Sequence, residues 1–98
     1  MKVRITTEAE QDIEAIGDFI TLDNPRRALE FIIELQEKCL DLGHFPRRFP
    51  LVPNLEHQGI RKRLYGNYLI FYRIEANCIT VLHVLNGAVD YLPLLSGE

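Results

Sequence analysis

The stretch from Tyr68 to Leu85, with the sequence YLIFYRIEANCITVLHVL, decides the fold of this chain. Residues 68–75 and 78–85 are rich in aromatic and β-branched side chains, which favour strands. Ala76-Asn77 lies between them and is typical of a tight turn. The stretch therefore predicts a β-hairpin.

Upstream, the chain predicts a strand over 2–6 and then two helices. Thr7-Glu8-Ala9-Glu10 is a capping box, and it begins a helix whose apolar stripe is Ala9, Ile13, Ile16 and Ile20. Asn24-Pro25 begins the second helix, since proline suits the first helical position, and Gly43 ends it. The second stripe is Ala28, Ile32, Leu35, Cys39 and Leu42, broadened by Leu29, Ile33 and Leu40. A two-residue link, Asp23-Asn24, makes the helices an antiparallel hairpin.

The remaining segments complete an α+β domain. Residues 44–59 hold three prolines and lack periodicity, so we expect a surface loop. Gly66-Asn67 marks a turn between a short strand over 60–64 and the hairpin, and residues 88–98 form an irregular or single-turn tail. Because no helical crossover separates the last strands, they form an antiparallel three-stranded meander packed on the helices. Residues 1–98 are therefore one domain.

Both faces of the predicted hairpin are apolar. One face of its first strand carries Tyr68, Ile70, Tyr72 and Ile74, and the other carries Leu69, Phe71, Arg73 and Glu75. Strict alternation in the second strand gives Cys78, Thr80, Leu82 and Val84 on one face and Ile79, Val81, His83 and Leu85 on the other. Two helices cover only one face of a sheet. The other face is covered either by the loop and tail, through Phe45, Phe49, Leu51 and Leu94, or by another molecule.

Charge is divided along the chain. The formal net charge of −3 argues weakly against nucleic-acid binding. Residues 1–41, however, hold ten acidic and five basic side chains, whereas residues 44–73 hold six basic side chains and one acidic side chain. An acidic helical part is thus followed by a basic middle of the chain.

Several classes of protein are disfavoured by the composition. No apolar run reaches the roughly 18 residues of a membrane span, and residues 1–7 lack the apolar core of a secretory signal. Cys39 and Cys78 show no motif spacing, so we expect two reduced thiols in a cytoplasmic protein. The three histidines have no metal-ligand spacing and no glycine-rich phosphate loop is present, so we expect no metal and no cofactor.

A basic run, Arg61-Lys62-Arg63, lies near Arg73 of the next strand and could hold phosphates. The alternatives are a solvated edge strand that resists aggregation, or basic charges paired with the acidic helices. As exposed strand charges, Arg61 and Arg63 would add little stability and could be reversed to glutamate without loss of the fold. His83 lies among apolar residues, which favours a satisfied, half-buried histidine over a general base.

Two segments resemble the RelE/ParE superfamily of bacterial toxins. The first is Gly66-Asn67-Tyr68-Leu69-Ile70-Phe71-Tyr72-Arg73, and the second runs from Val81 through Asn86-Gly87-Ala88-Val89-Asp90. The ParE branch has a glycine turn followed by Tyr-Leu-Ile-Phe-Tyr-Arg, then a strand ending Val-Leu-His-Gly-Ala-Arg-Asp. Asn86 and Val89 stand where that pattern has His and Arg. In the RNA-cleaving RelE branch the tail supplies a basic residue with a tyrosine or histidine, and here only Tyr91 is of that kind.

The resemblance implies a type II toxin of the ParE branch, neutralised by a cognate antitoxin. Such toxins bind DNA gyrase and trap cleaved DNA without hydrolytic chemistry and without sequence-specific nucleic-acid binding of their own. We expect the target to contact Arg61, Arg63, Arg73, Asn86 and Asp90, and the antitoxin to contact Leu69, Phe71, Ile79, Val81 and Leu85. An acidic antitoxin segment would complement the basic middle of the chain.

Two alternatives stay open. A ribosome-dependent mRNA endonuclease of the RelE type would use the arginines to hold phosphate and Tyr91 or His83 to move a proton. A non-toxic relic would bind its antitoxin and leave growth normal when expressed.

Overall fold

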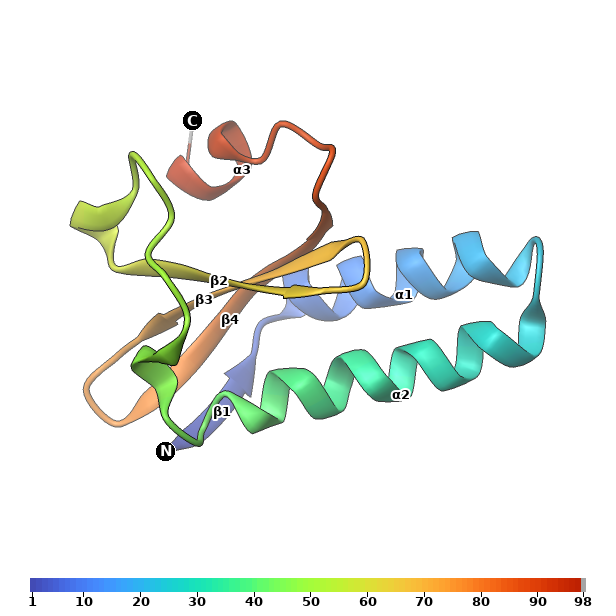
Figure 1. Ribbon diagram of the computed structural model, residues 1–98, viewed down its shortest axis with the longest axis horizontal. Coiled ribbons are helices and arrows are strands. Elements are labelled where there is room, and N and C mark those ends of the chain that lie inside the picture. The colour runs from blue at the N-terminus through green and yellow to red at the C-terminus, as the bar shows by residue number, and fades with distance from the viewer. Residues whose placement is uncertain (98) are drawn as a thin grey trace.

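The computed structural model describes residues 1–97 as a four-stranded sheet with two long helices on one face. The strands are β1 (Lys2–Ile5), β2 (Ile60–Tyr65), β3 (Tyr68–Ile74) and β4 (Cys78–Asn86), in the order β1-β4-β3-β2. Helices α1 (Thr7–Thr21) and α2 (Pro25–Asp41) lie on one side, and the short α3 (Leu92–Ser96) lies on the other (Figure 1). The predicted α+β class and meander are confirmed, and β1 joins the sheet parallel to β4.

Helix α1 is capped by Thr6, one residue before the predicted cap. The Thr6 hydroxyl oxygen accepts the Ala9 amide at 3.1 Å, and the hydroxyl donates to the Val81 carbonyl at 2.8 Å. Because Thr6 is tied to β4, the end of β1 and the start of α1 are fixed by the same side chain. The prediction of Thr7 as the cap is therefore wrong by one position, since the capping box alone contains no information about this tertiary bond.

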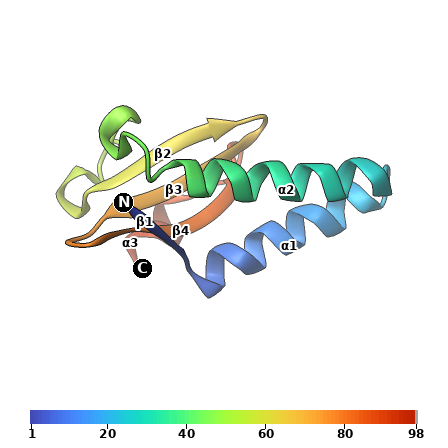
Figure 2. The ribbon, with the colours of Figure 1, turned by 90° about the horizontal axis from the view of Figure 1, so that it is seen from below.

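Helix α2 begins as predicted and packs closely on α1. The Asn24 side chain accepts the Arg27 amide at 3.1 Å, and Pro25 occupies the first helical position. A Cβ on Gly17 would lie 2.3 Å from Cδ1 of Ile32, so glycine permits this close approach of the helices. Figure 2 shows the two helices meeting at their link and diverging toward β1.

No described helix is long and apolar enough to cross a membrane.

The main core lies between the two long helices, α1 and α2, and the sheet. Its buried members come from α1, α2, β3 and β4, and they are Ala9, Ile13, Ile16, Phe31, Leu35, Cys39, Leu42, Ile70, Tyr72, Ile79, Val81 and Val84. The expectation that Leu29, Ile33 and Leu40 widen the core-facing stripe of α2 is wrong. Leu29, Ile33 and Leu40 are 64%, 47% and 57% exposed, because the core takes Phe31 from the other flank of the stripe.

A β-bulge in β4 changes which side chains face the helices. Pairing passes from Phe71–His83 to Tyr72–Val81, so Leu82 is an extra residue in β4. Ile79, Val81 and Val84 consequently all lie in the core beneath the helices. Strict alternation had placed Ile79 and Val81 on the face opposite Val84, and that assignment is wrong because the bulge brings all three to one face.

The second face of the sheet is covered by the loop and the tail. Val52 and Leu55 from the loop and Leu95 from α3 bury Phe71 and Ile60 there. Self-coverage is therefore the correct alternative, although other side chains provide it. Phe45 and Leu94, which were expected to fold back, are 78% and 52% exposed.

Candidate functional site

Arg61 fastens the loop to the sheet. It lies opposite Tyr72 in the ladder and thus on the helix side of β2. Its Nη1 donates to the carbonyl oxygens of Arg47 at 3.2 Å and Phe49 at 2.6 Å. Its guanidinium is therefore occupied by the backbone of its own chain.

Arg63 fastens the end of α2 to β2. Its Nη1 donates to the Lys38 carbonyl at 3.1 Å and to Oδ2 of Asp41 at 2.9 Å. The guanidinium lies 4.8 Å from the centre of the Phe49 ring, and the side chain is only 12% exposed. The hydrogen bond from Arg63 lowers the pKa of Asp41. The alternative of a charge paired with an acidic helix is therefore confirmed for Arg63. The expectation that Arg61 and Arg63 are exposed strand charges is wrong, because both hold neighbouring segments in place.

Arg73 lies on the opposite face of the sheet from Arg61 and Arg63. It pairs across the ladders with Ile60 and Thr80 and makes no ion pair among residues 1–97. It lines a cavity of about 170 Å³ under α3, together with Thr6, Glu8, Ile60, Leu82, His83, Leu94 and Leu95. The three arginines therefore do not form one cluster.

His83 is paired with a carboxylate that the sequence did not identify as its partner. Its Nδ1 lies 2.7 Å from Oδ2 of Asp12 on α1, and the same oxygen accepts the Val84 amide at 3.0 Å. The two side chains are 22% and 21% exposed. The expected satisfied histidine is thus observed. Asp12 gave one sequence signal, since it lies at i+3 from Ala9 and borders the apolar stripe.

Tyr91 is packed in the second cluster. Its ring centre lies 4.8 Å from that of Phe71, and both belong to the apolar cluster beneath α3. The Asn86 side chain accepts the Ala88 amide at 2.9 Å within an exposed turn, and Asp90 is exposed nearby in sequence. Asn86 and Asp90 thus lie at the end of β4 that is remote from Arg73.

Only part of the expected antitoxin-binding set is accessible. Phe71, Ile79 and Val81 are fully buried, and so they present no surface to a partner here. Leu69 and Leu85 are partly buried. Leu85 lines a groove of about 300 Å³ between α1 and the end of the β3–β4 hairpin, whose apolar walls include Phe19 and Tyr68.

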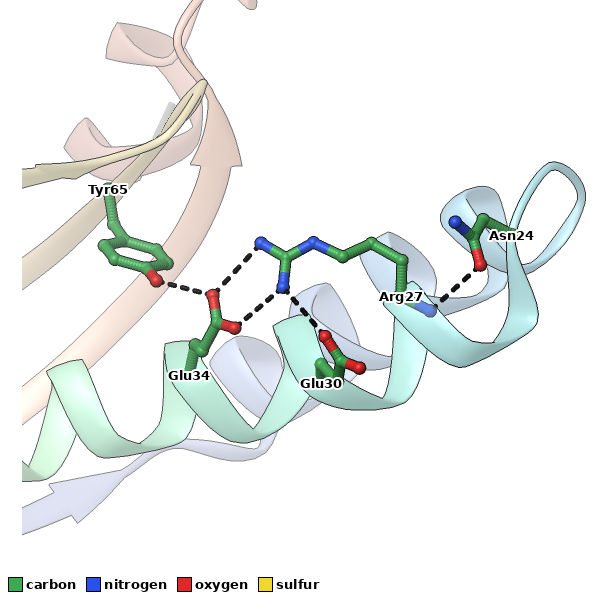
Figure 3. Close-up of polar contacts among 5 residues, drawn as sticks. All are labelled: Asn24, Arg27, Glu30, Glu34 and Tyr65. Carbon is green, nitrogen blue, oxygen red and sulfur yellow. Dashed lines mark hydrogen bonds and ion pairs between the residues drawn. The ribbon is translucent and has the colours of Figure 1, made fainter.

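A polar network joins α2 to β2 (Figure 3). Arg27 makes a two-pronged ion pair with Glu34, at 2.7 and 3.1 Å, and the Tyr65 hydroxyl donates to Glu34 at 2.5 Å. These bonds lower the pKa of Glu34, with Arg27 as the larger cause, and the bond to Glu34 raises the pKa of Tyr65. The network is structural and connects the hairpin to the edge strand.

The described residues offer neither a cluster of metal ligands nor, at Cys39, a reactive thiol. Residues 1–97 contain no group of three His, Cys, Asp or Glu side chains able to hold a metal ion. Cys39 is fully buried, and burial raises the pKa of its thiol to about 12. A thiol with that pKa is not a nucleophile at neutral pH.

A helical hairpin packed on a β1-β4-β3-β2 sheet is a fold found in solved toxin–antitoxin systems. A chain of the chromosomal ParDE system from P. aeruginosa matches with a TM-score of 0.74 and 21% identity, over 88% of this chain and 95% of that chain. A chain of the toxin–antitoxin complex RelBE2 from Mycobacterium tuberculosis matches with a TM-score of 0.64 and 25% identity, over 87% of this chain and 95% of that chain. No curated protein matches significantly.

The class is therefore that of the RelE/ParE superfamily of toxins. Residues 3–91 match the family described as the ParE toxin of type II toxin-antitoxin system, parDE. The chain belongs to this family.

Proposed function

We propose that this chain is a toxin that binds DNA gyrase and traps cleaved DNA, without chemistry of its own. The observation that carries the proposal is the state of the two candidate proton-transfer groups. Tyr91 is packed against Phe71, and Nδ1 of His83 is held by Asp12. Residues 88–98 contain no basic side chain to stabilise a phosphorane-like charge. A toxin that works through its surface and not through catalysis fits these features, and a gyrase target implies a cytoplasmic location.

Arg73 is the basic side chain that we assign to contact the target. Arg61 and Arg63 donate to carbonyl oxygens of their own chain, whereas Arg73 makes no ion pair within residues 1–97. We retain Asn86 and Asp90 as exposed contact candidates.

We also propose that a cognate antitoxin covers the groove between α1 and the β3–β4 hairpin. Phe19 at this groove is 69% exposed and lines it together with other apolar side chains, and a contiguous exposed apolar surface of this kind marks an interaction site. Tyr68 and Leu85 form the opposite wall, and Leu69 continues the apolar surface on β3. The two similar solved structures come from toxin–antitoxin systems, which supports this choice of partner.

The test is a gyrase supercoiling and DNA-cleavage assay with the purified chain. We expect inhibition together with trapped double-strand breaks, and loss of both with Arg73→Glu. Arg47→Glu is the matched control, because it makes the same charge change at an exposed loop position. Absence of inhibition by a folded wild-type protein would contradict the proposal.

A RelE-type mRNA endonuclease is the second candidate, favoured by one observation. His83 and Arg73 line the same small cavity under α3, and a histidine with an arginine can move a proton and stabilise a phosphoryl transition state. This candidate predicts codon-phased cuts in mRNA on translating ribosomes, abolished by His83→Ala. Intact mRNA in cells that accumulate DNA breaks would exclude it.

A further inference from the structure

A second apolar surface lies on the helical hairpin, on the side away from the antitoxin groove proposed above. Leu29, Ile33 and Leu40 of α2 are 64%, 47% and 57% exposed. At 100° per residue these three side chains and Gln36 fall within about 60° of the helix circumference. They form one stripe, which we call the hairpin stripe, and it spans about 16 Å along α2 at 1.5 Å per residue.

The hairpin stripe borders a hollow between the two helices. A cavity of about 400 Å³ is lined by Gln36 and Leu40 on α2, by Glu10 and Ile13 on α1, and by Ile5 of β1. The helices diverge toward β1 at this place, as Figure 2 shows. The shape is that of a trough between two helices with an apolar floor, which suits the apolar face of a third helix.

The rims of this trough are acidic and unpaired. Glu10 and Glu14 lie one turn apart on the α1 side, and Glu37 borders the hairpin stripe on α2. None of the three makes an ion pair with any described residue of the chain. Of the basic side chains of α2, only Arg26 falls beside the stripe by helical spacing. The field over the trough is therefore negative, opposite in sign to that of the basic middle of the chain.

We propose that this trough docks a basic amphipathic helix of a partner protein. Leucine-like side chains of that helix would fill the hollow beside Leu40 and Ile33, and lysines or arginines on its flanks would meet Glu10, Glu14 and Glu37. About three helical turns match the 16 Å length of the stripe. A second copy of this chain is a poorer occupant, because a symmetric contact through the same surface sets glutamate against glutamate.

The test uses a labelled 14-residue helical probe peptide with leucines along one face and lysines on both flanks. Fluorescence anisotropy should show saturable binding that weakens with salt, and a probe with glutamates in place of the lysines should bind at least about tenfold more weakly. The double variant Ile33→Ala with Leu40→Ala should lose about tenfold in affinity. Leu64→Ala is the matched control, since Leu64 is 66% exposed on β2, away from the trough.

Charge reversal gives a second, independent reading. Glu10→Lys with Glu14→Lys should weaken the lysine probe and strengthen the glutamate probe. The melting temperature should fall by only a few degrees, because both positions are exposed and, of the two, only Glu10 lies in the first turn of α1. Equal affinity for the two probes, or unchanged binding by the Ile33/Leu40 variant, would overturn the proposal. A dimer in sedimentation that this variant dissociates would also overturn it and assign the stripe to self-association.

Discussion

Replacing Asp12 by alanine tests whether the Asp12–His83 pair is structural. Oδ2 of Asp12 accepts two hydrogen bonds, from His83 at 2.7 Å and from the Val84 amide at 3.0 Å. Hydrogen bonds to a charged group contribute roughly 1.5–3 kcal/mol each, and the donors left behind would lie at a mostly buried position. Water can reach part of this site, since the Asp12 side chain is 21% exposed. We therefore expect the free energy of unfolding to fall by about 2–3 kcal/mol.

The assay is thermal and urea unfolding followed by circular dichroism. For a domain of this size each kcal/mol lowers the melting temperature by about 4–8 °C, so a fall of roughly 10–20 °C is expected. Glu14→Ala removes the same charge from an exposed position of the same helix and should change the melting temperature by only a few degrees.

The outcome also separates structure from catalysis. If Asp12→Ala kept the wild-type melting temperature yet abolished toxicity, the pair would act in function and the structural reasoning would be refuted. If stability falls as expected and toxicity returns at low temperature, where the variant is folded, the role is confirmed as structural.

Three further predictions follow from the same contacts. Arg63→Glu should lower the melting temperature far more than Lys62→Glu, because Arg63 bonds to Lys38 and Asp41 whereas Lys62 makes no ion pair within residues 1–97; equal melting curves would contradict this. A disulfide reagent that reacts with free thiols should label Cys78 in the native protein and spare the buried Cys39. After denaturation it should label both cysteines. The pKa values of Glu34 and Asp41 are lowered from their ordinary values of 4.5 and 3.8. Both carboxylates therefore stabilise the folded state at neutral pH, and this contribution is lost as the pH falls through the lowered pKa values. Glu34→Gln should accordingly make the stability of the protein depend less on pH in the acid range.

Much of the fold was predictable from local patterns. Helical periodicity identified Ile13, Ile16, Leu35 and Cys39 as core positions, and turn residues marked the meander. These features depend on spacing along one element, which the sequence states directly. The bulge at Leu82 was not predictable, because an extra strand residue leaves no mark in the residue pattern and shows only in the pairing with β3.

The candidate site was less predictable for the same physical reason. Whether an arginine is free depends on which carbonyl oxygens and carboxylates the fold brings beside it. Arg63 meets the end of α2 across a sequence separation of 22 to 25 residues, and Asp12 meets His83 across 71 residues. The sequence pattern placed Arg73 on the strand next to Arg61 and Arg63, and only the tertiary contacts separate Arg73 from these two structural arginines.

The acidic first part of the chain and its basic middle remain separate in the folded molecule, and each gives its own region a charge of one sign. Of the ten acidic side chains in residues 1–41, Asp41 alone pairs with the basic middle, through Arg48 and Arg63. The acidic rims of the hairpin and the basic side chains near the sheet are therefore not neutralised by each other. Partners of opposite charge should then be recognised at separate places, and both steps should weaken as salt screens them. A net charge of −3 thus describes neither surface, and a salt series with acidic and basic probes would measure each field separately.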